Sequence, residues 1–160
     1  MDSLITELTR FAADWLMLPI VIITVAALVF KVDSRNRYQI YARIVMAGLT
    51  SYLVAKLVSL VIQPAALRPF ELLGVEAGAS YLNNPGFPSD HALFAMFLTL
   101  AVWYATRNKA LALTLLSLTL LVGLGRVLAL VHTPLDVIGG LLIALVGVVW
   151  YRQSYKKVLQ

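Results

Sequence analysis

Residues 110–131 read ALALTLLSLTLLVGLGRVLALV and contain one charged side chain, that of Arg126. A helix needs about 20 predominantly apolar residues to cross a hydrocarbon core of about 30 Å. The stretch is continuous and lacks the alternating pattern of a membrane β-strand. It therefore predicts a transmembrane helix.

Four other apolar stretches surround it, at residues 11–30, 41–63, 89–106 and 134–151. Only 13% of the 160 residues are charged and 61% are hydrophobic, whereas a soluble domain carries about 25% charged residues. So few charges do not cover the surface of a small soluble domain. We expect an all-α fold, an integral membrane helical bundle with about five transmembrane helices, and one membrane-embedded domain over residues 1–160.

The composition and the N-terminal residues argue against several other classes. The chain has no Cys, which is unlike a disulfide scaffold. The first residues include Asp2, Glu7 and one base, Arg10. They lack the basic start of a signal peptide and predict a short amphipathic lead-in to an uncleaved span. The net charge of +5 does not by itself indicate nucleic acid, so we expect membrane lipids as partners and no nucleic acid.

The Lys and Arg residues predict the orientation of the bundle. Nine of the 13 bases lie near the ends of the first, third and fifth spans: Lys31, Arg35, Arg37, Arg43, Arg107, Lys109, Arg152, Lys156 and Lys157. Alternating spans put all nine on one side, and the positive-inside rule makes that side the cytoplasm. We therefore expect a multi-pass protein of the cell membrane with its N-terminus outside and its C-terminus in the cytoplasm.

Seven further ionisable residues gather at the opposite, outer end of the expected bundle. They are Lys56, Arg68, Asp90, His91, Arg126, His132 and Asp136. Ionisable side chains at membrane depth are costly, and by default they mark a functional site. Their segregation at one end predicts a site on the outer face.

Two helix starts lie within this group. Ser89 is a candidate N-cap, and the free backbone N–H groups that follow it form an anion site. Thr133 is a candidate N-cap of the last span, with Pro134 at the first helical position. His132 then lies close to Asp136, and a carboxylate on one ring nitrogen raises the basicity of the other. Thr133 and Asp136 also match a capping box, which is a purely structural role.

These motifs resemble those of the type 2 phosphatidic acid phosphatase family of membrane lipid phosphatases. The family signatures are Lys-x6-Arg-Pro, Pro-Ser-Gly-His and Ser-Arg-x5-His-x3-Asp. Here they read Arg68-Pro69, Pro88-Ser89-Asp90-His91 and Gly125-Arg126-x5-His132-x3-Asp136, within a motif-bearing core of about residues 41–151. The chain has Val61 where the family has Lys, Asp90 in place of Gly, and Gly125 in place of Ser. The Pro-Ser-Asp-His variant, with Phe70 after Pro69, resembles the BcrC-type undecaprenyl-diphosphate phosphatases.

The resemblance implies a lipid phosphatase that removes the terminal phosphate of a polyprenyl diphosphate, undecaprenyl diphosphate, through a phosphohistidine. In that scheme His132 is the nucleophile, Asp136 orients it, and His91 transfers the proton. The phosphate would be bound by Arg68, Arg126 and Ser89, with Lys56 and Asp90 as further candidates. No cofactor and no metal are expected, because fixed positive charge and positioning suffice for phosphoryl transfer.

Several alternatives stay open at this point. Lys56 is a phosphate ligand, one half of a structural ion pair, or a base that reaches the headgroups; Asp90 orients a base or occupies the first helical turn. The alternative substrates are phosphatidate and phosphatidylglycerophosphate. His91, Asp90, His132 and Asp136 are also acceptable metal ligands. A non-catalytic lipid carrier or transporter would likewise place polar residues within a bundle.

Overall fold

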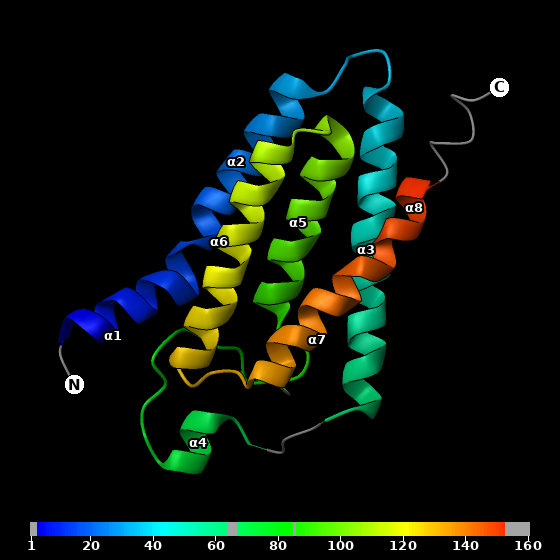
Figure 1. The fold of residues 1–160 in the computed structure, drawn as a ribbon. Helices are drawn as coiled ribbons and strands as arrows, with labels where there is room; N and C mark the ends of the chain where they lie inside the picture. The colour runs from blue at the N-terminus through cyan, green and yellow to red at the C-terminus, as the bar shows by residue number, and fades with distance from the viewer. Residues whose placement is uncertain (1–2, 64–66, 85, 153–160) are drawn as a thin grey trace.

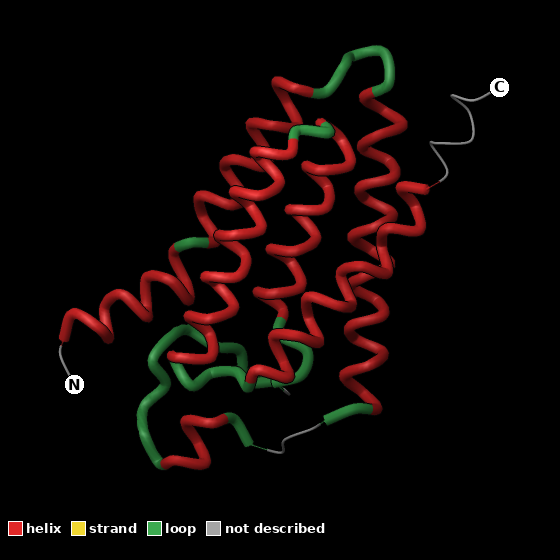
Figure 2. Tube along the Cα trace, viewed as in Figure 1, coloured by secondary structure: helices red, strands yellow, loops and turns green. Residues whose placement is uncertain are grey.

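The computed structural model describes residues 3–63, 67–84 and 86–152, and within them it contains helices and loops but no strand (Figure 2). The segments are α1 (Ser3–Arg10), the π-helical η1 (Phe11–Trp15), α2 (Met17–Lys31), α3 (Arg37–Val61), α4 (Pro69–Leu73), α5 (Asp90–Thr106), α6 (Lys109–Leu128), α7 (Pro134–Ala144), the 3₁₀ segment η2 (Leu145–Val148) and α8 (Val149–Arg152) (Figure 1). The prediction of an all-α membrane bundle is confirmed.

The long helices fall on the five apolar stretches, whereas the short helices α1 and α4 lie outside them. Four helical stretches are long and apolar enough to cross a membrane: Leu4–Lys31, Arg37–Val61, Lys109–Leu128 and Pro134–Arg152. Helix α5 has 17 residues, which is at the short end of the range for a transmembrane helix. The first of the four begins earlier than residue 11, because α1 continues into η1 and α2. Helix α1 leaves the bundle at an angle (Figure 1).

Helix α5 is the centre of the bundle. It contacts α2, α3, α6 and α7, and Figure 1 shows it between them. The main apolar core lies where α2, α5 and α6 meet, and its buried members are Ile20, Ala27, Ala95, Leu98, Val102, Leu115 and Val122. Large apolar side chains such as Leu121 and Leu124 of α6 are instead exposed. An apolar exterior of this kind is suited to a membrane, because the lipid tails are as apolar as these side chains.

The two ends of the bundle carry different residues. The links at residues 32–36 and 107–108 lie at one end, together with α8 (Figure 1). This end holds the basic residues that predicted the cytoplasmic side, except Lys156 and Lys157, which lie outside the described residues. The link that contains α4 and the turn between α6 and α7 lie at the other end (Figure 2). The charges are therefore separated as expected, and the side of the membrane that each end faces stays a prediction.

The starts of α5 and α7 are joined at this second end. The backbone N–H of Ser89 donates to the carbonyl of Asp136 at 2.9 Å. One turn further along α7, a Cβ on Gly140 would lie 2.5 Å from the carbonyl oxygen of Ser89. Position 140 therefore needs glycine for the two helices to approach. This close contact brings the Pro-Ser-Asp-His segment beside His132 and Asp136.

We predict that Gly140→Ala destabilises the bundle by about 1–3 kcal/mol, the usual cost of overpacking. The added methyl group would push α7 away from the backbone of Ser89. A thermal melt in detergent should show a lower Tm. The matched control is Leu142→Ala on the same helix, where the side chain is 59% exposed and its loss should barely change Tm. Equal melting of Gly140→Ala and wild type would contradict this account of the contact.

Candidate active site

The turn between α6 and α7 places His132. Helix α6 ends at Leu128, and Leu130 adopts a left-handed backbone conformation with φ 60°. The chain then folds back, so that the N–H groups of Val131 and His132 both lie 3.3 Å from the carbonyl oxygen of Arg126. The six-residue spacing of Arg126 and His132 thus closes one compact turn at the end of a helix.

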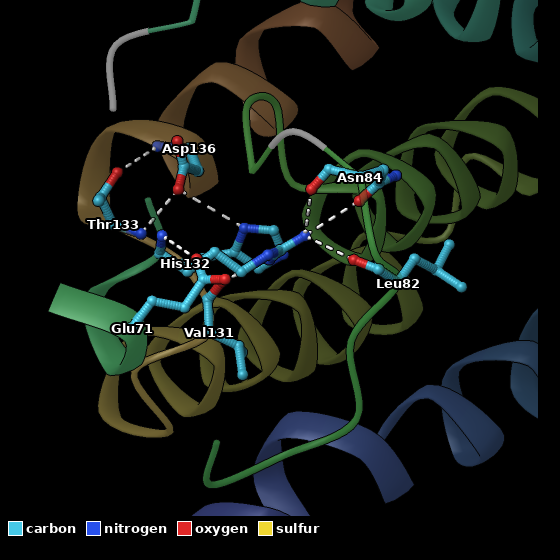
Figure 3. Close-up of polar contacts among 8 residues, drawn as sticks. Glu71, Leu82, Asn84, Val131, His132, Thr133 and Asp136 are labelled. Carbon is cyan, nitrogen blue, oxygen red and sulfur yellow. Dashed lines mark hydrogen bonds and ion pairs between the residues drawn. The ribbon is translucent and has the colours of Figure 1, made fainter. Parts of the chain in front are cut away.

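A capping box orients Asp136 toward His132. The Thr133 hydroxyl accepts from the Asp136 N–H at 3.2 Å, and Asp136 Oδ2 accepts from the Thr133 N–H at 2.7 Å. The same Oδ2 lies 3.6 Å from Nδ1 of the buried His132 ring (Figure 3). This separation is longer than a hydrogen bond. The capping role and the contact with His132 therefore coexist, but the contact is an electrostatic one in this structure.

Burial sets the protonation state of His132. It lowers the pKa of the imidazole below its usual 6.5, and the neighbouring Asp136 carboxylate opposes that shift. The positive charges of Arg126 and Arg68 lower the pKa of His132 further. A His whose pKa lies below 6.5 is neutral at pH 7, and the neutral ring is the nucleophilic form.

Arg68 joins the α4 link to this turn. Its Nη1 donates to the Val131 carbonyl at 2.6 Å, next to His132. Its Nη2 lies 3.1 Å from the carbonyl oxygens of both Leu82 and Asn84 and 3.0 Å from Asn84 Oδ1 (Figure 3). The backbone N–H of Arg68 donates to Glu71 at the start of α4. These bonds hold the buried guanidinium of Arg68 beside the catalytic candidates.

Arg126 is almost fully buried near the end of α6, where it forms an ion pair with Asp14. The side chain is 1% exposed, and its Nη1 lies 2.9 Å from Asp14 Oδ1. Sequence reasoning missed both Asp14 and the loop acceptor Asn84. Asp14 did carry a signal, because it is the only charged residue in the stretch 11–30 and an ionisable residue in a span is a functional candidate. Asn84, in a polar loop, carried none.

The motif residues meet around one small cavity of about 50 Å³. Its lining combines Arg68, His91, Arg126 and His132 with Leu82, Asn84, Pro88 and Asp90. A wider open cleft of about 370 Å³ shares Arg68 and Asn84 with the cavity and also borders Asp136. The structure thus brings together all three motifs. The chemical roles that the resemblance implies for these residues stay predictions.

Lys56, Asp90 and Ser89 are arranged differently from the other candidates. Lys56 Nζ lies 3.1 Å and 3.2 Å from the two carboxylate oxygens of Asp90. Of the three roles left open for Lys56, this geometry favours a structural ion pair. Ser89 occupies the N-cap position of α5, but its side chain makes no capping hydrogen bond. Its Oγ is buried without a hydrogen-bond partner among the described residues, and Ser89 lines neither the cavity nor the cleft, so its contact with a phosphate stays a prediction.

The acidic and imidazole groups bear on the alternative of a metal site, and the absence of a metal stays a prediction. In the part of the chain that the structure describes, no three His, Cys, Asp or Glu side chains are grouped closely enough to hold a metal ion. The cationic groups at the cavity are instead Arg68 and Arg126. Guanidinium groups bind phosphate oxygens through paired N–H donors.

Comparison with known proteins agrees with the motifs. The model of the PAP2 superfamily matches residues 37–159. The undecaprenyl-diphosphatase BcrC of Bacillus subtilis (strain 168) is 26% identical over 155 residues, which cover 96% of this chain and 77% of that protein. No solved structure matched the chain. Since the family model covers well over half of the residues, this multi-pass membrane protein belongs to the PAP2 superfamily.

Proposed function

We propose that the protein is a lipid phosphatase that hydrolyses the terminal phosphate of a polyprenyl diphosphate, undecaprenyl diphosphate, at the outer face of the cell membrane. The observation that carries the proposal is the cavity where two histidines and two arginines meet at one end of an apolar bundle. Membership of the PAP2 superfamily supports the phosphatase activity. The similarity to a Bacillus undecaprenyl-diphosphatase supports the choice of substrate.

The proposed reaction proceeds in two steps. Nδ1 of His132 faces Asp136, so Nε2 attacks the terminal phosphorus. The bond from this phosphorus to the bridging oxygen breaks as the N–P bond forms, and His91, protonated in the complex with the anionic substrate, gives its proton to the leaving oxygen. Water, activated by the now neutral His91, then attacks the phosphohistidine and releases inorganic phosphate. Arg68 and Arg126 stabilise the charge on the transferred group, and no metal takes part.

An apolar groove supports a substrate with a long hydrocarbon chain. The groove measures about 570 Å³, and its apolar wall is formed by Met17, Leu18 and Val21 of α2 and Phe94 of α5. Leu18 and Phe94 are 56% and 44% exposed, so the groove opens sideways on the lipid-facing surface. Its polar end is formed by Asp14, Asp90 and His91, and His91 also lines the cavity. A lipid entering from the membrane could thus keep its chain in the groove and its phosphate at the histidines.

We predict that His132→Ala abolishes phosphate release from undecaprenyl diphosphate in detergent, because the nucleophile is lost. Leu135→Ala is the matched control, since this neighbouring side chain is 53% exposed and lines neither the cavity nor the cleft. The measurement is inorganic phosphate released from a panel that also contains phosphatidate and phosphatidylglycerophosphate.

The panel separates the competing functions. A higher kcat/KM for phosphatidate or phosphatidylglycerophosphate would transfer the proposal to that substrate. Full activity of His132→Ala would refute the nucleophile, and no release from any lipid by the wild type would favour a carrier or transporter. Loss of turnover in excess EDTA, with recovery on adding a divalent cation, would contradict the metal-free mechanism.

The pH dependence of kcat/KM should show an acid limb below pH 6.5. The neutral form of His132 is required, and burial lowers its pKa, so protonation inactivates the free enzyme only at more acidic pH. Asp136 raises the pKa of His132, and Asp136→Asn should therefore move this limb to still lower pH while reducing kcat. A limb at or above pH 6.5, or one that the Asn variant leaves in place, would argue against His132 as the group that titrates.

A further inference from the structure

The carboxylate of Asp14 connects the N-terminal helix to the site. Asp14 lies in η1, and its Oδ1 accepts from Arg126 Nη1 at 2.9 Å and from the Ser80 hydroxyl at 2.8 Å. Its Oδ2 accepts from the backbone N–H of Ser80 at 3.0 Å. Three donors from two distant segments therefore fix this one carboxylate. Asp14 precedes residues 37–159, which match the family, so it is not part of the motif pattern.

Gly125 makes this connection sterically possible. The motif that the chain resembles has Ser at this position. Here a Cβ on Gly125 would lie 2.6 Å from the backbone nitrogen of Ala13 and 2.8 Å from the carbonyl carbon of Ala12. Contacts that short with backbone atoms are not relieved by a rotamer change. The η1 segment thus packs directly on α6 at a glycine, and the next residue on each segment is a member of the ion pair, Asp14 or Arg126.

The ion pair uses one side of the Arg126 guanidinium. Nη1 is engaged by Asp14, whereas Nε is buried and has no hydrogen-bond partner among the residues that the structure describes. Arg126 also lines the cavity with His91 and His132. A guanidinium is planar and presents its Nε and Nη2 hydrogens in parallel, which matches two oxygens of a phosphate. Because Asp14 holds Nη1, the edge formed by Nε and Nη2 remains free to bind a phosphate.

We propose that Asp14 is a positioning residue for phosphate binding: it anchors Arg126 through Nη1 so that the Nε edge of the guanidinium meets the substrate phosphate. This inference rests on the proposed function, which it deepens by adding a residue from outside the family motifs. The negative charge of Asp14 does not repel the substrate strongly, because Arg126 and the two Ser80 donors neutralise and bind it. Without Asp14, the guanidinium would lose its fixed orientation.

The kinetic test uses two substitutions at position 14. Asp14→Ala should reduce kcat/KM for undecaprenyl diphosphate by about 10- to 100-fold, the effect expected from losing a hydrogen bond between charged groups. Asp14→Asn retains an oxygen that accepts from Nη1, so it should recover a large part of this loss. Ser80→Ala is the matched control: it removes one hydrogen bond from the same carboxylate without touching Arg126, and it should change kcat/KM by less than about threefold.

A double-mutant cycle separates positioning from general stability. In an Arg126→Ala background, Asp14→Ala should have almost no further effect on kcat/KM, because its action passes through Arg126. An equal fold-loss in both backgrounds would overturn the proposal, and so would wild-type kinetics of Asp14→Ala. If the alanine variant does not fold, the cycle is run with Asp14→Leu, which has a similar size but no oxygen to accept from Nη1, and its melting in detergent is compared with that of Ser80→Ala.

A binding measurement keeps this test independent of turnover. Inorganic phosphate, or vanadate, should raise the Tm of the wild type, and Asp14→Ala should need at least about tenfold more of the anion for the same rise. If the wild type hydrolyses no lipid phosphate but shows this shift, the proposed function fails and the role of Asp14 stands. If neither anion stabilises the wild type, or if the variant responds equally, the role of Asp14 is refuted.

Discussion

The requirement that the cations at the α4 end of the bundle be paired organises this structure. Moving a charge from water into lipid or apolar protein costs several kcal/mol unless partner groups compensate it. Arg126 is paired with Asp14, Lys56 with Asp90, and the Arg68 guanidinium with loop carbonyls. These partners fix the cations before any substrate arrives. If these cations bind phosphate as proposed, their fixed orientation means that little rearrangement is needed during the reaction.

The same requirement explains where the site lies. Backbone groups free to accept hydrogen bonds are found at helix ends and in loops, not along helices whose groups bond internally. The carbonyls that hold Arg68 come from the turn after α6 and from the loop before α5. The exposed flanks of the helices carry mainly apolar side chains, with few polar ones such as Thr114 and Ser117 of α6. Because free backbone acceptors occur only at helix ends and in loops, the polar site lies at one end of the bundle, beside the apolar groove.

The sequence predicted those parts of the fold and site that depend on local pattern. Apolar runs located the long helices of the bundle. The capping box of Thr133 and Asp136 could be recognised because its partners are three residues apart. The pairing of Asp14 with Arg126, 112 residues away, follows from helix packing and leaves no local pattern. The acceptors around Arg68 are mainly backbone carbonyls, which every residue type carries, so the sequence does not mark them. Gly125 was visible as a departure from the family motif, but its reason appears only with η1 packed against it.

The packing of η1 on Gly125 has an evolutionary consequence. A side chain at position 125 and this placement of the N-terminal helix exclude each other, since backbone atoms of Ala12 and Ala13 occupy the space. A lineage that regained Ser at this position would have to move the helix and give up the carboxylate of Asp14. Residues 14 and 125 should therefore be inherited together, with glycine and an acid in some descendants and neither in others.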